Sequence, residues 1–221
     1  IKKTLTDLIS KNNKVFLLTH FRRPRGSYNS NYSVEFLVDE IKNIMNISNI
    51  YFVNDCIGSK VKETIIKMNY GEICLLENVR FYKEEEENDL NFSKKLSQNF
   101  DIYINDSFSA SHRTHASVVG ITQFLPSYGG ILFEKELIAL NNILKVPKKP
   151  IMAIIGGSKI STKISLLENL VTNLDYLVIA GGMANTFLAS QGYNLGKSTI
   201  EANLFDKAIE IQKKAKKFSC K

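Results

Sequence analysis

The sequence lacks the features that mark several specialised classes of protein. None of its apolar runs is long enough to span a bilayer, and its first residues do not begin a signal peptide. The three cysteines are far apart and form no CxxC pair: Cys56, Cys74 and Cys220. This pattern predicts reduced thiols in a cytoplasmic protein that has no membrane partner.

Little in the sequence indicates a nucleic-acid-binding protein. The formal net charge is +7, but residues 1–130 hold 16 Lys+Arg against 15 Asp+Glu, while residues 131–221 hold 13 against 7. Much of that excess is one run, typical of a solvated helix face: Lys213, Lys214, Lys216 and Lys217. No RNP-like aromatic box or zinc-finger spacing accompanies it. We expect no nucleic-acid partner, and only strongly salt-dependent DNA binding would revive that alternative.

Short apolar, β-branched runs alternate with amphipathic segments. This alternation predicts right-handed βα crossovers and largely parallel sheets, hence an α/β protein. The expected strands are Val15–Thr19, Ile50–Val53, Ile73–Leu76, Ile102–Ile104, Ile151–Ile155 and Tyr176–Ile179. The expected helices are one capped by Ser33, with Phe36, Leu37, Ile41 and Ile44 on its apolar face, one over Glu134–Lys145 and one over Leu204–Lys217. The run Glu84–Glu87 predicts an exposed acidic loop or helix start.

Polar, charged and glycine-rich motifs follow the carboxyl ends of the expected strands, where open α/β sheets bind their ligands. They are His20–Arg23, Glu77–Arg80, Asn105–Arg113, Gly156–Lys159 and Gly181–Asn185. The first three are basic and favour a phosphate or carboxylate pocket, because arginine offers a rigid fork of donors to such groups. Two alternatives stay open at this point: a solvated basic loop at His20–Arg23, and a structural ion pair between Arg80 and Glu77.

The last two motifs combine a strand, a glycine pair and a helix start. Glycine lets the backbone approach a ligand, and a helix N-terminus attracts phosphate. Lys159 and Lys163 are expected on one helix face, at i and i+4. The segment Gly192–Ser198 has only three residues between its glycines and follows a helix, so we do not interpret it as a P-loop.

Taken together and in this order, the motifs resemble those of the phosphoglycerate kinase family. THFRRP is similar to (S/T)HxGRP, LLENVRF to LLEN(L/V)RF, and NDSFSASHRTHAS to DAFGTAHRAHAS. GGILFEKEL, IIGGSKISTK and AGGMANTFL are similar to (A/G)GxLMxKEL, GG(A/S)KxxxK and GGGMAxTFL. The resemblance covers residues 1–221 almost continuously.

The resemblance implies two Rossmann-like parallel-sheet domains joined by a hinge helix, both of them incomplete here. Residues 1–130 correspond to a phosphoglycerate-binding domain, 131–147 to the hinge helix, and 148–221 to the first part of a nucleotide-binding domain. The implied reaction is reversible phosphoryl transfer between 1,3-bisphosphoglycerate and MgADP, giving 3-phosphoglycerate and MgATP, by a monomer. The Mg²⁺ is carried with the nucleotide, and this chain supplies no metal ligand.

The resemblance also implies roles for particular residues. The substrate-binding residues are His20, Phe21, Arg22, Arg23, Arg80, His112, Arg113 and His115. The nucleotide-binding residues are Gly157, Lys159, Lys163, Gly181 and Gly182. The catalytic residues are Lys159, Arg80 and Arg113, and Lys159 stabilises the phosphoryl group during transfer.

Two departures from the family pattern matter. Arg22 stands where the family has glycine, which strains the loop if that position needs a positive φ. The chain also begins after the family's first strand and ends before its GGGD(T/S) loop and acidic residue. We therefore expect this chain to be inactive by itself, and the alternative to a partial enzyme is a non-catalytic anion-binding remnant.

Overall fold

The computed structural model describes residues 1–144 and 148–221. They divide into two compact units, unit 1 (Ile1–Ala139) and unit 2 (Leu140–Lys221). Helix α6, Ile131–Leu144, crosses this division at the position of the expected hinge helix. Residues 145–147, including the expected end of that helix at Lys145, lie outside the described residues. The hinge role and the domain bounds stay predictions.

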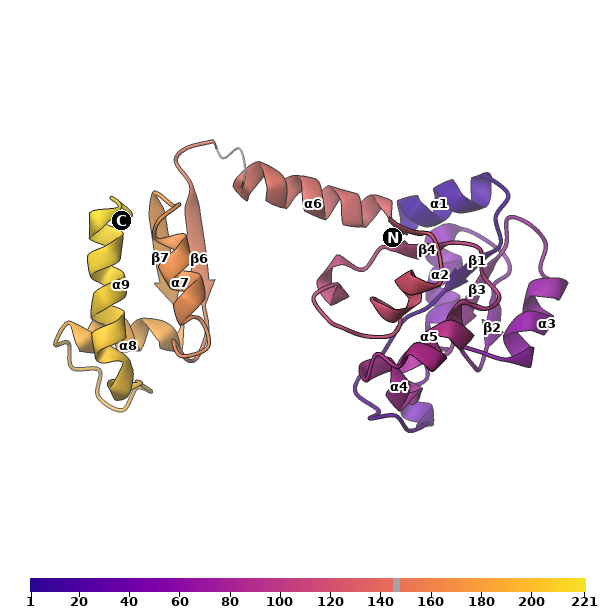
Figure 1. The fold of residues 1–221 in the computed structure, drawn as a ribbon, viewed down its shortest axis with the longest axis horizontal. Coiled ribbons are helices and arrows are strands. Elements are labelled where there is room, and N and C mark those ends of the chain that lie inside the picture. The colour runs from indigo at the N-terminus through magenta and orange to yellow at the C-terminus, as the bar shows by residue number, and fades with distance from the viewer. Residues whose placement is uncertain (145–147) are drawn as a thin grey trace. The chain divides into compact units, whose positions relative to one another are not determined.

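Unit 1 alternates strands with helices (Figure 1). Its elements before α6 are α1 (Lys2–Ser10), β1 (Val15–Leu17), α2 (Leu37–Met45), β2 (Tyr51–Val53), α3 (Ser59–Lys67), β3 (Ile73–Leu76), α4 (Lys83–Glu86), α5 (Leu90–Ser97), β4 (Tyr103–Asn105) and β5 (Ser127–Gly129). Short 3₁₀ helices cover Ser30–Tyr32, Val79–Phe81, Phe108–Ala110 and Gly120–Gln123. All the described pairings are parallel, in the order β1-β3-β2 and in a separate pair β4-β5.

The central strand β3 separates two hydrophobic cores. Ile73 and Leu75 face one core, and Cys74 and Leu76 face the other. All four side chains are buried, because a parallel strand covered on both faces needs an uninterrupted apolar run. The residues that follow β3, Glu77–Arg80, are therefore attached to a strand that is packed on both faces.

Unit 2 packs three helices on one face of a two-stranded parallel sheet (Figure 1). Its elements are β6 (Met152–Gly156), α7 (Ile164–Leu170), β7 (Tyr176–Ala180), α8 (Gly182–Ser190), a 3₁₀ helix (Ala202–Leu204) and α9 (Phe205–Lys217). The core is formed by Leu167 of α7, Met183 of α8 and Ile211 of α9. On β6, Met152 and Ile154 are 57% and 68% exposed.

The α/β fold with parallel sheets is confirmed, and one helix start is corrected. Each expected strand is present: β3 has the expected bounds, and the ends of the others differ by at most two residues. Ser33, however, is not the N-cap of α2, which begins at Leu37 with Phe36 as its N-cap. The Ser33 hydroxyl instead donates to Glu77 Oε2 at 2.8 Å, and it accepts from the Glu35 amide in a turn before the helix. In the described part of the chain, no helix has both the length and the apolar character that crossing a bilayer requires.

Candidate functional site

Asn78, the second residue after β3, fixes the loop that carries His20–Arg23. Its side chain is completely buried. Its amide nitrogen donates to the carbonyls of Phe21 at 2.7 Å and Tyr32 at 2.8 Å, and its amide oxygen accepts from the Arg80 backbone at 3.1 Å. The two basic segments are therefore held together by one satisfied buried amide.

Glu77 is a second anchor, and the proposed Arg80–Glu77 ion pair is wrong. The Glu77 carboxylate is buried and accepts from the backbone amides of Val34 at 3.0 Å and Asn78 at 2.7 Å. Those bonds and the one from Ser33 occupy both oxygens. Arg80 turns to Glu86 instead, with Nε 3.3 Å from Glu86 Oε1.

Arg80 is a buried cation at the edge of the β1-β3-β2 sheet. It is 5% exposed, and its Nη1 donates to the Arg22 carbonyl at 3.0 Å. Its Nε makes no hydrogen bond to any described group, since the Glu86 contact lies outside hydrogen-bond geometry. Burial lowers the pKa of Arg80 from its usual value, with Arg113 and Arg23 adding to the shift against the opposing charges of Glu86 and Glu85. Among the described groups, the Nε–H of Arg80 therefore has no hydrogen-bond acceptor, and the positive charges of Arg113 and Arg23 lie nearby.

His20 and Arg113 meet beside Arg80. Arg113 Nη1 lies 3.3 Å from His20 Nε2, although the two residues are 93 positions apart. Burial, followed by the charges of Arg80, Arg113 and His115, lowers the pKa of His20 to about 4. The imidazole is therefore neutral at pH 7, and its Nε2 accepts from the guanidinium while Nδ1 carries the proton. We call His20, Arg80 and Arg113 the basic cluster.

The other expected substrate-binding residues occupy different surroundings. His115 Nδ1 lies 3.5 Å from Glu85 Oε1, and its charge is close enough to lower the pKa of His20. Arg23 is exposed, and its charge reaches Arg80. His112 is exposed. Phe21 is half-buried: its ring packs against a hydrophobic core of unit 1 and edge-on against the exposed Phe36, with centroids 5.2 Å apart.

Arg22 adopts the backbone conformation that a glycine would supply. Its φ is 59°, in the left-handed region. Its guanidinium lies 5.3 Å from the centroid of the Phe21 ring, and its carbonyl accepts from Arg80. The loop therefore holds a non-glycine residue in a strained conformation and carries its positive charge.

Of the two expected alternatives for the run Glu84–Glu87, a helix start agrees with α4, but the run is not uniformly exposed, because Glu85 is only 2% exposed. Its Oε2 accepts from the Ser117 amide at 2.9 Å and its Oε1 from the Ser117 hydroxyl at 2.6 Å. These bonds join α4 to the segment that follows Arg113. Sequence reasoning missed this residue, since Glu85 and Ser117 are 32 positions apart.

Asp106 links the segment that carries Arg113 to α6, a connection that the sequence analysis also missed. Its Oδ1 accepts from the amides of Leu132 at 2.9 Å and Phe133 at 3.0 Å, in the first turn of that helix. Its Oδ2 accepts from the Thr4 hydroxyl at 2.7 Å. A carboxylate at a helix N-terminus is stabilising because unpaired amides and the helix dipole face it.

In unit 2 the two glycine motifs pack backbone against backbone beyond β6 and β7. A Cβ on Gly181 would lie 3.0 Å from the Gly157 carbonyl oxygen, and a Cβ on Gly182 would lie 2.8 Å from that of Ser158. Gly181 also has φ 68° and ψ −158°, a region open essentially to glycine alone. The close approach of the two loops therefore requires glycine at positions 181 and 182.

The expected shared helix face of Lys159 and Lys163 is wrong, because α7 begins only at Ile164. The preceding turn is held by Glu201, whose Oε2 accepts from the amides of Ile160 at 2.7 Å and Ser161 at 3.2 Å. The Ser161 hydroxyl, which also donates to this carboxylate, is the largest cause of the lowered pKa of Glu201. Lys159 is therefore an exposed residue of a loop beyond β6.

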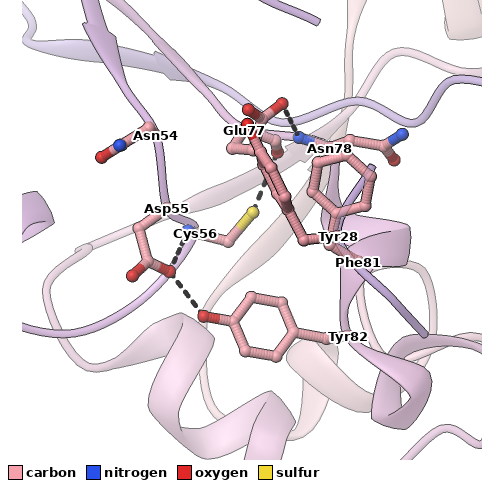
Figure 2. Close-up of a pocket in the computed structure, with 8 residues that line it drawn as sticks. All are labelled: Tyr28, Asn54, Asp55, Cys56, Glu77, Asn78, Phe81 and Tyr82. Carbon is pink, nitrogen blue, oxygen red and sulfur yellow. Dashed lines mark hydrogen bonds between the residues drawn. The ribbon is translucent and has the colours of Figure 1, made fainter. Parts of the chain in front are cut away.

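Figure 2 shows a pocket of about 200 Å³ that is distinct from the basic cluster in its chemistry. It is lined by Tyr28, Asn54, Asp55, Cys56, Glu77, Asn78, Phe81 and Tyr82. Asp55 Oδ1 accepts from the Cys56 amide at 2.7 Å and the Tyr82 hydroxyl at 2.5 Å. With two carboxylates and aromatic walls, this pocket does not suit an anion.

Across residues 1–144 and 148–221, no three His, Cys, Asp or Glu side chains are grouped as metal ligands. The described residues therefore do not by themselves form a cage for a divalent cation. Mg²⁺ commonly binds through one or two carboxylates together with the phosphates of a substrate, so a nucleotide-borne ion is compatible with this arrangement.

The basic cluster lies beyond strands of unit 1 and the glycine loops lie beyond strands of unit 2, in an α/β protein with parallel sheets. The family model for phosphoglycerate kinase matches residues 1–221. The phosphoglycerate kinase of Bartonella bacilliformis is 47% identical over 219 residues, which cover 99% of this chain and 54% of that protein. That of Rhizobium meliloti is 47% identical over 220 residues, 100% of this chain and 55% of that protein.

Solved structures agree with the sequence comparison. The structure of phosphoglycerate kinase from Coxiella burnetii matches with a TM-score of 0.83 and 35% identity, over 99% of this chain and 55% of that chain. Phosphoglycerate kinase from Pyrococcus horikoshii matches with a TM-score of 0.78 and 28% identity, over 98% and 54%. The chain belongs to the phosphoglycerate kinase family, and it spans about half the length of the curated relatives it matches.

Proposed function

We propose that this chain takes part in reversible phosphoryl transfer between 1,3-bisphosphoglycerate with MgADP and 3-phosphoglycerate with MgATP. In this proposal unit 1 binds the phosphoglycerate and unit 2 binds the nucleotide. The observation that carries it is the basic cluster, in which Arg113 lies 3.3 Å from a neutral His20, next to the buried Arg80. The names of the relatives support the same reaction.

The chemistry of the basic cluster suits a phosphorylated carboxylate. Two guanidinium groups that never lose their protons offer fixed donors to phosphate or carboxylate oxygens. An anion bound beside Arg80 and Arg113 would weaken the mutual repulsion of the cations. Arg23, His112 and His115 are proposed as outer contributors to the same positive field.

In unit 2, the glycine loops would bring backbone amides close to a nucleotide, with Gly157, Gly181 and Gly182 as its wall. Lys159 and Lys163 would then reach its phosphates from the loop before α7. We assign to Lys159 the neutralisation of charge on the transferring phosphoryl group, since such transfer depends mainly on positioning and electrostatic stabilisation. The Mg²⁺ ion would enter with the nucleotide and supply positive charge beside its phosphates.

We also propose that the protein acts in the cytoplasm as a monomer, with no membrane or nucleic-acid partner. The free, buried thiols of Cys56, Cys74 and Cys220 support a reducing compartment.

A crossed binding experiment tests the division of labour. Isothermal titration calorimetry would measure the affinities of the chain for 3-phosphoglycerate and for MgADP. Arg80→Ala is expected to weaken 3-phosphoglycerate binding roughly 10- to 100-fold, because a hydrogen bond to a charged group contributes about 1.5–3 kcal/mol, and to leave MgADP binding unchanged. Lys159→Ala, the matched control, is expected to leave 3-phosphoglycerate binding unchanged. If Arg80→Ala weakened both ligands equally, the assignment of the basic cluster would be wrong.

A coupled assay for ATP formation from 1,3-bisphosphoglycerate and MgADP tests the reaction itself. Turnover that is lost in Lys159→Ala supports a catalytic chain. Binding of both 3-phosphoglycerate and MgADP without turnover is the result expected for this chain by itself. Binding of 3-phosphoglycerate alone supports the alternative function, a non-catalytic anion-binding protein.

A further inference from the structure

Glu85 occupies an unusual position for a carboxylate, because it is buried beside a surface of opposite charge. It is 2% exposed, and removing a carboxylate from water is costly unless it is paired and hydrogen-bonded. The described partners of its carboxylate belong to one short segment. The Ser117 amide and hydroxyl donate to its two oxygens, and His115 Nδ1 lies 3.5 Å from Oε1.

The backbone of Glu85 binds the same segment. Its carbonyl accepts from the Ala116 amide at 2.9 Å, so Glu85 contacts each of the three residues His115, Ala116 and Ser117. This segment begins two residues after Arg113, whose guanidinium meets His20. A residue that fixes the segment therefore limits where the Arg113 side chain can lie.

The next residue, Glu86, acts on the other side of the basic cluster through its ion pair with Arg80 Nε. The four-residue helix α4 thus contacts both arginine-bearing segments, through Glu85 on one and Glu86 on the other. Because the described partners of Glu85 are His115–Ser117 and those of Glu86 include Arg80, α4 sets the spacing between the two halves of the cluster.

We propose that Glu85 is a positioning residue for phosphoglycerate binding: it holds His115 and the segment after Arg113 so that Arg113, His20 and Arg80 present their donors together. This inference deepens the proposed function and rests on it. Glu85 itself does not touch the substrate.

A comparison of variants separates this positioning role from a merely structural one. Glu85→Gln keeps the shape of the side chain but removes the charge that faces His115. Ser117→Ala removes one hydrogen bond to the same carboxylate and leaves the contact with His115 in place. For each variant, calorimetry would measure the affinity for 3-phosphoglycerate, thermal unfolding would measure stability, and ¹⁵N NMR would report the ring nitrogens of His115.

We expect Glu85→Gln to weaken 3-phosphoglycerate binding about tenfold and to shift the His115 ring signals, whereas Ser117→Ala lowers the unfolding temperature and leaves the affinity within about twofold. Equal affinity in Glu85→Gln and the unmodified chain would overturn the positioning role alone. Losses of affinity that follow stability equally in both variants would also overturn it. If Glu85→Gln does not fold, Glu85→Asp, which keeps the charge but moves it away from His115, takes its place with the same criteria. An unmodified chain that does not bind 3-phosphoglycerate would overturn the proposed function and this inference with it.

Discussion

Two glycines with nearly the same backbone conformation allow strain and crowding to be measured separately. Gly181 precedes α8 with φ 68° and ψ −158°, and Gly58 precedes α3 with φ 85° and ψ −159°. Alanine at either position is forced into a region that costs about 1–3 kcal/mol. Only the surroundings differ. A Cβ on Gly58 meets no atom within 4 Å, whereas one on Gly181 meets the Gly157 carbonyl oxygen at 3.0 Å.

The second contact adds a cost that alanine at position 58 does not have. The obstructing atom belongs to the backbone of the neighbouring loop, so it cannot rotate away, and overpacking of this kind costs about 1–3 kcal/mol. We therefore expect Gly181→Ala to reduce local stability by roughly 2–6 kcal/mol and Gly58→Ala by roughly 1–3 kcal/mol.

Native-state hydrogen exchange, followed by NMR at the amides of α8 and α3, measures each loss against its own unit. Gly181→Ala should also weaken MgADP binding, because the crowded atoms form the proposed wall of the nucleotide site. Equal losses of stability in the two variants would refute the close approach of the two glycine loops as the reason for Gly181.

Three further predictions concern the polar anchors. Asp106→Ala should speed exchange of the first amides of α6 roughly fivefold to tenfold by NMR, since loss of a helix cap costs about 1 kcal/mol, and unchanged exchange would contradict the cap. The pKa of Glu201 is lowered in the folded state, so its carboxylate accepts from the Ile160 amide at any pH above the ordinary glutamate pKa of 4.5. This hydrogen bond weakens as pH falls through the lower folded pKa. The Ile160 amide chemical shift should change in that pH range in the unmodified chain and not in Glu201→Gln. His20 has a pKa of about 4 in the folded chain against 6.5 when unfolded, so the free energy of unfolding should fall as pH drops from 6.5 to 4. Urea unfolding of His20→Gln should lack this part of the pH dependence. A His20 ring that titrates near 6.5 by NMR would contradict the prediction.

The strands and the basic cluster were predictable from the sequence because their signals are local. Ile73–Leu76 is a continuous apolar run, and its burial on both faces follows from that pattern alone. His20 and Arg80 follow β1 and β3 of one sheet, and the carboxyl ends of parallel strands meet at one edge. Position relative to a strand was therefore sufficient to bring His20 and Arg80 together. Arg113 follows β4 of the separate β4-β5 pair, and only the fold shows that it reaches His20.

The anchors were not predictable, because each depends on a partner far away in the sequence. Glu85 is one of four consecutive glutamates, and only the fold selects it to bind Ser117. Glu201 lies 41 positions from Ile160. Its hydrogen bonds stabilise a turn in the segment where the sequence predicted a helix bearing Lys159 and Lys163. Strand β5, Ser127–Gly129, was missed because its three residues are exposed and carry no alternation of apolar and polar side chains.

The central claim is that unit 1 binds the phosphoglycerate and unit 2 the nucleotide. The most direct test is a ¹H–¹⁵N NMR titration of the chain with each ligand separately, following side-chain signals of His20, Arg80 and Arg113 and backbone signals of Gly157 and Gly181. We predict that 3-phosphoglycerate shifts the first group and leaves the second in place, and that MgADP does the reverse. Shifts of Gly157 and Gly181 on addition of 3-phosphoglycerate, with the basic cluster unmoved, would contradict the account.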